Sequence, residues 1–508
     1  MLVLIPTAGI GSRLDFNTRY MNKSLLQMGD LPVLSRIIES YPLKTKFIIA
    51  LGYKGDHIKE YLNLVYPNKK ITFVKVKNYK GRGAGLTLTL RNCLKKINKP
   101  FFFHANDTIF NDKSYHKNVR LDTMYIHKGS SDTMKYATVQ MANGQNKINY
   151  KLNYQKKNCY NYTGVAFIKN FTLFKKLVKN DKENRGELTY FKKIDQNKID
   201  FKFVSSWFDI GDKEKKTKAE NFFLKKNILP KYDQAIFFKD KRVIKFFVNK
   251  NIINKRLKRA KILQKYVPKI LKYGRYFYVY KFVDGKILST VHDKKVFIFF
   301  LNWLVNNFWK IKKLSKNKKI IFKERCFDFY YEKTLSRISL LFERNNLDDK
   351  DEIINGIKIP RISDLLTRID WKELTNGIPS NFHGDLHLEN ICINKKKITL
   401  LDWREDFSQI TDYGDIYYDL AKINHGFIID HKIIKNSKYS IDIGKTNIRF
   451  KFYQEEKNRM FQKIFFKFLK KHNFSEKKVK ILTSLIYLNI SPLHHYPYSF
   501  FLYYLGKY

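Results

Sequence analysis

Short apolar runs alternate with amphipathic stretches through the first half of the chain. The apolar runs have the length of strands, and the stretches between them carry apolar residues at helical spacing. This alternation predicts an α/β domain with a doubly wound, mostly parallel, Rossmann-like sheet covered by helices on both faces. The predicted strands lie at 2–6, 46–53, 71–77, 100–107 and 202–210, and the predicted helices at 31–41, 55–66, 83–97 and 212–226.

The pattern changes near residue 228. Residues 235–248 read as a β-hairpin that turns at 239–241, residues 276–285 as another strand, and long helices follow. A chain of 508 residues also exceeds the usual size of one hydrophobic core. We therefore expect two domains, an α/β domain at 1–228 and an α+β domain at 229–508.

The formal charge is +53, which raises nucleic acid as a partner. However, the lysines accompany many Asn, Ile, Phe and Tyr residues, which are amino acids of AT-rich codons, and they spread along the whole chain. The sequence holds no zinc-finger, basic-zipper or RNP pattern. We expect no specific nucleic-acid partner, while attraction to anionic substrates or to a membrane surface stays open.

Cysteine usage and hydropathy suggest a cytoplasmic protein. The four cysteines stand far apart without metal-site spacing, as expected of reduced thiols. No signal peptide is evident at the N-terminus. The most apolar segment, 296–310, is short and interrupted by Asn, which favours a core helix over a transmembrane helix.

Two groups of residues in the first half suggest a site for nucleoside triphosphates. Gly9 and Gly11 directly follow a predicted strand, where a turn can present backbone amides to phosphates. Arg13 and Lys23 supply cations nearby. Asp107 and Asp209 each end a strand, at the edge where doubly wound sheets bind ligands, and two carboxylates there can hold Mg²⁺ against phosphates. A strand-to-helix turn without a ligand is the structural alternative.

Taken together, residues 1–225 resemble the sugar-phosphate and phosphocholine nucleotidylyltransferases (MobA-like nucleotidyltransferases). The resemblance implies attack of an acceptor phosphate on the α-phosphorus of CTP or UTP, with Arg13 and Lys23 as catalytic residues and Asp107 and Asp209 as magnesium ligands. It implies Gly164 and Glu187 as acceptor contacts. The nucleotide-binding residues that it implies are Ala8, Gly9, Gly11, Ser12, Gly81 and Gly83, and the matching motif continues through Leu14, Ser24, Leu25 and Gly85. The family often has Pro where Asn22 stands here.

The segment "HGDLHLENICINKKKITLLDW", 383–403, suggests a second site. Asp385 and Asn390 share one loop, and a short hairpin then delivers Asp402. Phosphoryl transfer from ATP needs a carboxylate that orients a hydroxyl, together with an amide and a carboxylate that hold Mg²⁺. We expect His383 to brace the loop. An acidic turn with an incidental His is the alternative.

Residues 232–508 resemble the aminoglycoside phosphotransferase and choline kinase family, whose members are two-lobed relatives of protein kinases. The resemblance implies ATP as a substrate, Asp385 as the catalytic residue, and Asn390 and Asp402 as magnesium ligands. Lys245, on the predicted hairpin, would contact the ATP phosphates. Asp415 and Asp419 would steady the loops. Kinase lysines of this type usually pair with a Glu on the next helix, yet residues 249–265 contain no acid.

Both resemblances on one chain suggest consecutive reactions. A small alcohol (a choline-like amino alcohol, a polyol or a sugar) would be phosphorylated with ATP. The phosphate ester would then be coupled to CTP or UTP, giving a nucleotide-diphospho-activated precursor for the decoration of a surface polysaccharide or lipid. Two alternatives remain open: a nucleotidyltransferase fused to a catalytically degenerate kinase-like binding domain, and a nucleic-acid-modifying enzyme suggested by charge alone.

Overall fold

The computed structural model describes residues 1–14, 16–127, 129, 132–142, 145–223, 233–430, 433, 436 and 438–508. The chain divides into two compact units. The first contains Met1–Lys250 and Leu271–Tyr280, and the second contains Asn251–Ile270 and Lys281–Tyr508. The domain boundary predicted between residues 228 and 229 lies outside the described residues.

A mixed, nine-stranded sheet forms the centre of the first unit. Strand β1 pairs in parallel with β4 and β6, and β4 pairs in parallel with β5, whereas β11 runs antiparallel to β6. The sheet therefore has a parallel, doubly wound half and a mixed half, which confirms the predicted fold class. Its strands are β1 (Leu2–Pro6), β4 (Lys46–Leu51), β5 (Ile71–Lys75), β6 (Phe101–His104), β8 (Thr123–His127), β9 (Thr138–Ala142), β10 (Gln145–Asn149), β11 (Cys159–Ile168) and β12 (Asp200–Val204).

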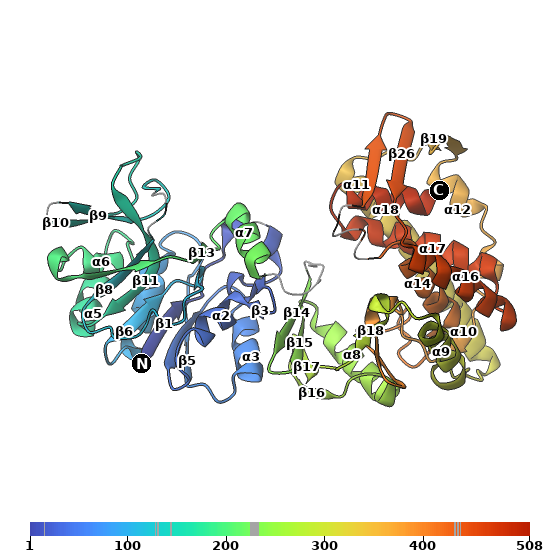
Figure 1. Ribbon diagram of the computed structural model, residues 1–508, viewed down its shortest axis with the longest axis horizontal. Coiled ribbons are helices and arrows are strands. Elements are labelled where there is room, and N and C mark those ends of the chain that lie inside the picture. The colour runs from blue at the N-terminus through green and yellow to red at the C-terminus, as the bar shows by residue number, and fades with distance from the viewer. Residues whose placement is uncertain are drawn as a thin grey trace. The chain divides into compact units, whose positions relative to one another are not determined.

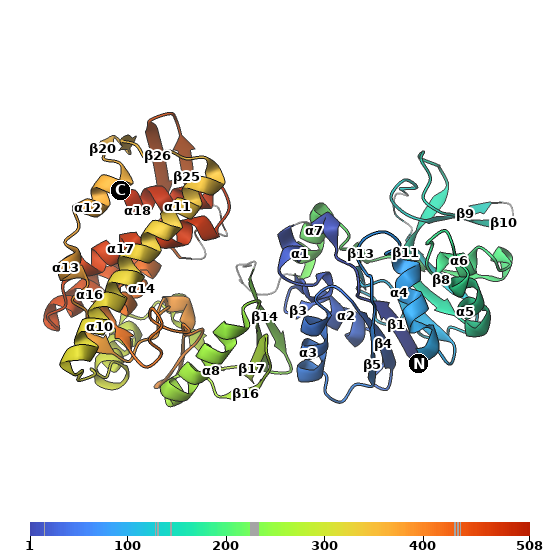
Figure 2. The ribbon, with the colours of Figure 1, turned by 180° about the vertical axis from the view of Figure 1, so that it is seen from behind.

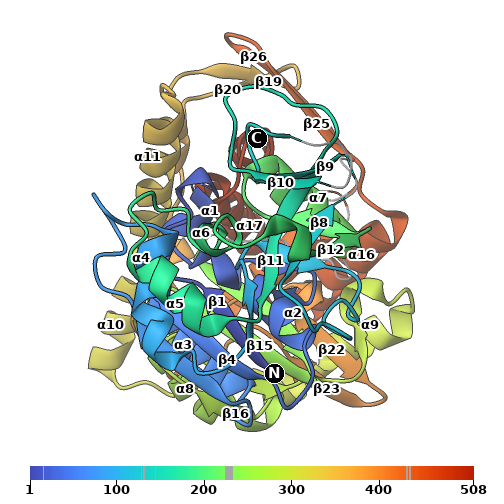
Figure 3. The ribbon, with the colours of Figure 1, turned by 90° about the vertical axis from the view of Figure 1, so that its left-hand side faces the viewer.

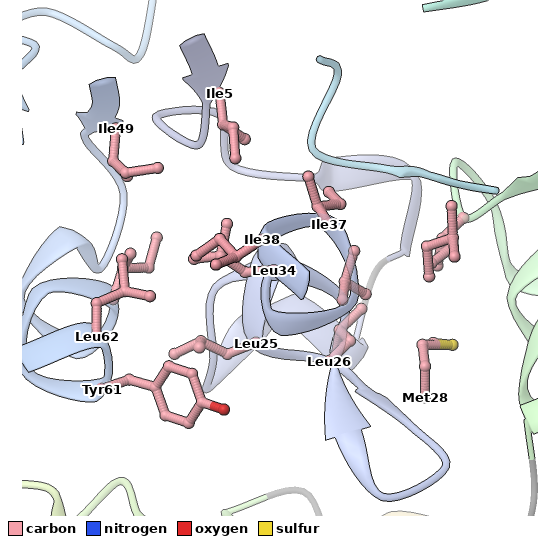
Figure 4. Packing of buried hydrophobic residues seen from close by; sticks show 14 of the residues in the cluster. Ile5, Leu25, Leu26, Met28, Leu34, Ile37, Ile38, Ile49, Tyr61 and Leu62 are labelled. Carbon is pink, nitrogen blue, oxygen red and sulfur yellow. The ribbon is translucent and has the colours of Figure 1, made fainter. Parts of the chain in front are cut away.

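Helices cover both faces of this sheet because its buried strands are apolar on both sides. Helices α2 and α3 lie on one face, where Ile5 and Ile49 pack against Leu34 and Leu62 (Figures 1 and 4). Helices α4 and α5 lie next to one another on the other face (Figures 2 and 3). The helices of this unit are α1 (Phe16–Arg19), α2 (Val33–Glu39), α3 (Gly55–Val65), α4 (Leu86–Cys93), α5 (Phe171–Lys179), α6 (Leu188–Phe191) and α7 (Lys213–Phe223).

Two small two-stranded sheets complete the first unit. Strand β7 (Thr108–Phe110) pairs with β13 (Trp207–Asp209) in antiparallel orientation, and β2 (Gln27–Met28) pairs with β3 (Leu31–Pro32). The pairing of β7 with β13 joins segments that are about 100 residues apart in sequence, at the carboxyl end of β6.

The predicted hairpin forms, and its sheet packs on α3 within the first unit. Strands β14 (Gln234–Lys239), β15 (Arg242–Phe247), β17 (Phe277–Lys281) and β16 (Ile270–Tyr273) form a four-stranded sheet in that order. The ring of Phe237 meets that of Tyr61 edge to face at 5.5 Å, and Glu60 accepts the backbone N–H groups of Tyr276 and Phe277. This hairpin therefore shares the core of the first unit.

The second unit is mainly helical, and α14, α16 and α17 lie side by side in it (Figures 1 and 2). Its helices are α8 (Lys250–Leu263), α9 (Lys294–Trp303), α10 (Lys316–Phe327), α11 (Lys333–Asn345), α12 (Ile362–Thr367), α13 (Trp371–Leu374), α14 (Ile416–Ile428), α16 (Glu456–Lys471), α17 (Glu476–Ile490) and α18 (Tyr498–Lys507). Its strands are β18 (Lys286–Ile287), β19 (Glu352–Ile354), β20 (Ile357–Ile359), β21 (Pro379–Ser380), β22 (Ile391–Asn394), β23 (Lys397–Leu400), β24 (Gly414–Asp415), β25 (Tyr439–Ile443) and β26 (Asn447–Phe452).

The segment predicted as a core helix begins as α9 and continues as a π-helical turn, Leu304–Phe308. Over the described ranges, no helix combines the length and the apolar character that crossing a bilayer requires. The four cysteines are free and buried.

Candidate active sites

The glycine loop after β1 is fixed by Asn22. Its side-chain amide donates to the carbonyls of Thr7 and Tyr53 at 3.1 and 2.6 Å, and its Oδ1 accepts the N–H of Ser24. Gly11 adopts φ +74°, a conformation that other residues rarely adopt. Asn22 thus ties the loop to the turn that carries Lys23, although the resembling family often has Pro at this position.

Lys23 and Asp107 form a short ion pair. Lys23 is buried, and its Nζ lies 2.5 Å from Oδ2 of Asp107, which follows β6. Burial acts to raise the pKa of the Asp107 carboxyl, but the charges of Lys23 and Arg13 outweigh it, so the pKa is lowered. Arg13 itself is exposed on the loop. The two predicted catalytic cations therefore act on the same carboxylate.

Asp209 lies beside Asp107 on the paired strand. Asp209 is in register with Thr108, and the N–H of Ile210 donates to the carbonyl of Asp107 at 2.8 Å. The carboxylate of Asp209 accepts the Tyr136 hydroxyl at 2.6 Å and pairs with Lys215 at 3.0 Å. The structure thus brings the two predicted magnesium ligands to adjoining strand ends.

Tyr136 and Lys215 were missed by sequence reasoning. The only signal was the position of Lys215 early in the helix that follows the Asp209 strand. Tyr136 stands far away in sequence, in an irregular segment. Nothing in the pattern of hydrophobic residues joins it to Asp209.

Gly81 and Gly83, predicted to bind the nucleotide, and Gly164, predicted to contact the acceptor, lie at the same end of the sheet. Gly81 and Gly83 adopt φ +90° and +81° before α4, and Gly83 lines a cavity of about 310 Å³. Gly164 adopts φ +82° at an irregularity in β11, where an added Cβ would lie 2.8 Å from the Cβ of Ala105. The carbonyl of Gly164 accepts the N–H of Ala105. Gly164 therefore permits the close approach of β11 to the segment that carries Asp107.

Glu187 is a buried acid at the start of α6. Burial, together with the charge of Asp107, raises the pKa of its carboxyl to about 7. No described residue forms a hydrogen bond with its Oε2. Carboxyl groups with strongly perturbed pKa values cluster at functional sites.

We expect Glu187→Gln to stabilise the first unit at alkaline pH. The folded state holds the Glu187 proton up to a pKa of about 7, against 4.5 in the unfolded chain. The wild-type protein therefore loses stability between these pH values, by at most about 3 kcal/mol. Urea denaturation at pH 5 and pH 8, followed by hydrogen exchange of first-unit peptides, measures this. The exposed control Glu183→Gln should change neither midpoint, and an equal pH response of Glu187→Gln and wild type would contradict the expectation.

The loop that carries Asp385 is held by α14. The Asp419 carboxylate accepts the N–H groups of His383 and Gly384 at 2.8 and 2.7 Å, and it also accepts the indole N–H of Trp309. Asp415 accepts the Tyr330 hydroxyl at 2.8 Å. Asp419 therefore contacts the Asp385 loop directly, whereas Asp415 contacts Tyr330 and the backbone N–H of Ile378 outside that loop.

Asp385, Asn390 and Asp402 come to one edge of the hairpin β22–β23. The Asn390 amide donates to the Asp385 carbonyl at 2.9 Å and lies 3.3 Å from its carboxylate. The N–H of Leu401 donates to the carbonyl of Asn390 at 2.7 Å, which brings Asp402 alongside. Asp402 adopts φ +55°, a conformation that is enriched at functional sites.

The two histidines of this loop, His383 and His387, are surrounded by neighbouring protein groups that set their pKa values. Burial lowers the pKa of His383 to about 4, so this ring is neutral, and its Nδ1 accepts the N–H of Asp385. Burial acts to lower the pKa of His387, but Asp385 and Glu389 outweigh it and raise the pKa. The Nδ1 of His387 lies 2.8 Å from Glu389. His383 is thus placed to brace the loop, as predicted.

Two cations that sequence reasoning missed contact the predicted catalytic carboxylate, Asp385, and the predicted magnesium ligand, Asp402. Lys422 on α14 lies 3.0 Å from Oδ1 of Asp385. Arg256 on α8 lies 2.5 Å from Oδ1 of Asp402 and 3.4 Å from Glu405. Helix α8 follows the hairpin β14–β15 and contains no acid. The resemblance implied a Glu on this helix, but the helix carries Arg256, which contacts Asp402.

Lys245 lies on β15, in the first unit, and is buried. Its backbone is in register with Ile236 on β14. Its contact with ATP remains a prediction.

The donor sets suit magnesium at both sites. Each offers two protein ligands, two carboxylates in the first unit and a carboxylate with an amide in the second, and Mg²⁺ in such sites takes its remaining oxygens from phosphates and water. No group of three or more metal-binding side chains occurs in the described ranges.

Known proteins were compared with this chain by sequence and by structure. A search of curated proteins finds no match. The fold of the first half is similar to a putative glucose-1-phosphate thymidylyltransferase from Bacillus anthracis, with 18% identity over 45% of this chain and 98% of the other and a TM-score of 0.37. It is also similar to a UDP-glucose pyrophosphorylase (17% identity, 44% and 97% covered, TM-score 0.37) and to the CTP:phosphocholine cytidylyltransferase from Streptococcus pneumoniae (16%, 44% and 98%, 0.35).

The second unit carries the family match. The model of the phosphotransferase enzyme family matches residues 251–429, which is 179 of the 508 residues. The matched range contains α8, the Asp385 loop, the hairpin β22–β23 and α14. Residues 251–429 thus match the phosphotransferase enzyme family, and they follow an N-terminal region with an α/β fold.

Proposed function

We propose that this chain is a bifunctional transferase that phosphorylates a small alcohol with ATP and then couples the phosphate ester to CTP or UTP. The product is a nucleotide-diphospho-activated precursor, and pyrophosphate is released. One observation supports the proposal: within each unit the predicted catalytic and magnesium-binding residues lie near one another. Lys23 contacts Asp107, and the strand of Asp209 pairs with the strand that follows Asp107. Asn390 contacts Asp385, and the Asn390 carbonyl accepts the N–H of Leu401, next to Asp402.

In the first reaction, Asp385 accepts a hydrogen bond from the alcohol hydroxyl and takes its proton as the oxygen attacks the γ-phosphorus of ATP. The bond from the γ-phosphorus to the bridging oxygen breaks, and ADP leaves. Lys422 lies 3.0 Å from Asp385 and orients its carboxylate. Asn390 and Asp402 would hold Mg²⁺, which neutralises charge on the phosphates when bound.

In the second reaction, an oxygen of the phosphate ester attacks the α-phosphorus of CTP or UTP, and pyrophosphate leaves. The protein must hold the two phosphates in line and neutralise the charge that develops. Arg13 and Lys23 supply that charge beside Asp107. Asp107 and Asp209 would hold Mg²⁺, while Gly164 and Glu187 border the acceptor. Decoration of a surface polysaccharide or lipid is the fitting use of such a product.

A mass-spectrometric screen tests this function. Purified full-length protein is incubated with ATP, with CTP or UTP, and with a panel of small alcohols. We expect a nucleotide-linked alcohol that requires both ATP and the second nucleotide. Absence of any nucleotide-linked product across a broad panel would contradict the proposal.

The pairing of Arg256 with Asp402 favours a second candidate, a nucleotidyltransferase fused to a degenerate kinase-like binding domain. In this candidate Arg256 replaces the magnesium ion at Asp402 permanently. If Asp402→Asn leaves every activity of the chain intact, this second candidate is correct, because a functioning kinase needs that carboxylate.

A further inference from the structure

Four cations act on one another in the second unit, and two of them, Lys422 and Arg404, also act on Asp385. Lys333 and Arg337 come from α11, Arg404 from the loop after β23, and Lys422 from α14. Lys422 forms the ion pair with Asp385, and the charge of Asp385 also acts on Arg404. The side chains come from three separate segments of the second unit.

One aromatic ring holds two of these cations together. The Nζ of Lys333 lies 4.2 Å from the centre of the Phe329 ring, and the guanidinium carbon of Arg404 lies 4.9 Å from the same centre. Lys333 also lies 5.9 Å from the centre of the Tyr418 ring. Like charges this close repel one another, so the arrangement needs a compensating interaction.

The carboxylates of the second unit compensate Lys333 only in part, through the more distant charge of Glu405. Asp385 pairs with Lys422, and Glu405 lies within 4 Å of both Arg256 and Arg404. Within the described ranges Lys333 forms no ion pair with a carboxylate, and its close partners are the two rings. Burial lowers the pKa of Lys333 well below its usual value, and the charges of Arg404, Lys422 and Arg337 lower it further, while Glu405 acts in the opposite direction without restoring it.

We propose that the alcohol phosphorylated at Asp385 is anionic, with a carboxylate or phosphate group that binds Lys333 and Arg404 while its hydroxyl meets Asp385. This inference rests on the proposed function of Asp385. An acceptor anion supplies the missing charge, and Arg404 and Lys333 can each donate hydrogen bonds to its oxygens.

The same geometry excludes a choline-like acceptor at this site. A quaternary ammonium is usually bound on the faces of aromatic rings. Here the protein's own Lys333 and Arg404 already occupy the ring of Phe329. A cationic acceptor would also meet the four positive side chains, with Asp385 already paired.

Calorimetry on the full-length chain without nucleotide tests the inference. The probes are D-glycerate (carboxylate), glycerol 3-phosphate (phosphate), glycerol (neutral) and choline (cationic). We expect one or both anionic alcohols to bind at least tenfold more tightly than glycerol and choline. The comparison of the two anions identifies the group that the site takes.

Lys333→Met should weaken binding of the anion at least tenfold, and Lys333→Arg should retain most of it. The matched control Lys323→Met removes an exposed charge from α10 and should leave binding unchanged. In ATP-dependent turnover, Lys333→Met should raise KM for the anionic alcohol more than it lowers kcat, because Lys333 binds the acceptor and takes no part in proton transfer.

The outcomes separate this inference from the proposed function. Phosphorylation of choline or glycerol at least as efficient as that of the anions would overturn the anionic assignment and leave the phosphotransferase function in place. Absence of binding by both anions, or binding unaffected in Lys333→Met, would likewise overturn the assignment. Binding of an anion that depends on Lys333, with no phosphoryl transfer from ATP, would support the anion site and contradict the kinase function alone.

Discussion

Replacing Asp385 by Asn should lower the rate of ATP-dependent phosphorylation by about 10²- to 10⁴-fold. The amide cannot take the proton of the acceptor hydroxyl, and Lys422 loses the carboxylate that it contacts at 3.0 Å. The nucleotidyltransferase reaction, supplied with a ready-made phosphate ester, should keep its wild-type rate. ADP release and nucleotide-linked product are measured on the same preparation, so the second activity also reports that the chain is folded.

The control for this variant is Asp412→Asn, which alters an exposed acid of the same unit that lies 3.8 Å from Lys258. It should keep both activities. Full ATP-dependent phosphorylation by Asp385→Asn would show that this carboxylate is not the catalytic base.

Replacing Asp107 by Asn should reduce nucleotidyl transfer by at least about 10²-fold and leave phosphorylation of the alcohol unchanged. Asp107 holds the buried Lys23 at 2.5 Å and is a predicted magnesium ligand, so the change disturbs a catalytic cation and a metal ligand at once. Pyrophosphate release from CTP or UTP with the phosphate ester measures the loss. Raising the magnesium concentration should recover part of the rate.

The matched control is Asp112→Asn, an exposed acid shortly after Asp107 whose turn contacts Asn can reproduce. It should retain nucleotidyl transfer. A wild-type rate in Asp107→Asn, with no change in magnesium dependence, would remove Asp107 from the site.

The fold of the first unit followed from local signals. The strands at Leu2–Pro6 and Lys46–Leu51 are buried on both faces, so their apolar runs carry the prediction alone. The hairpin at 235–248 was also predicted from its local pattern. In the structure Asp240 and Lys241 form its turn with positive φ. The sequence did not predict that this hairpin packs on α3. The contact of Phe237 with Tyr61 joins residues far apart in the chain, and neither has a local signature.

The site residues also divide into those that local spacing predicted and those that it did not. Short sequence spacings predicted that Asp385, Asn390 and Asp402 lie together. Asp385 and Asn390 precede the hairpin β22–β23, and Asp402 follows it. The partners of these acids come from distant elements: Arg256 from α8 and Lys422 from α14. With 99 basic residues in the chain, no pattern singles out Arg256, Lys333 or Lys422. Only their burial and their contacts distinguish them.

The most direct test of two consecutive reactions on one chain follows the phosphorus atoms. Full-length protein is given ATP labelled at the γ-phosphate, unlabelled CTP or UTP, and the alcohol that the screen identifies. We predict one labelled phosphorus per nucleotide-linked product, in the phosphate next to the alcohol, and loss of that label in Asp385→Asn. A nucleotide-linked product that forms without the label, or that Asp385→Asn labels as well as wild type does, would contradict the account.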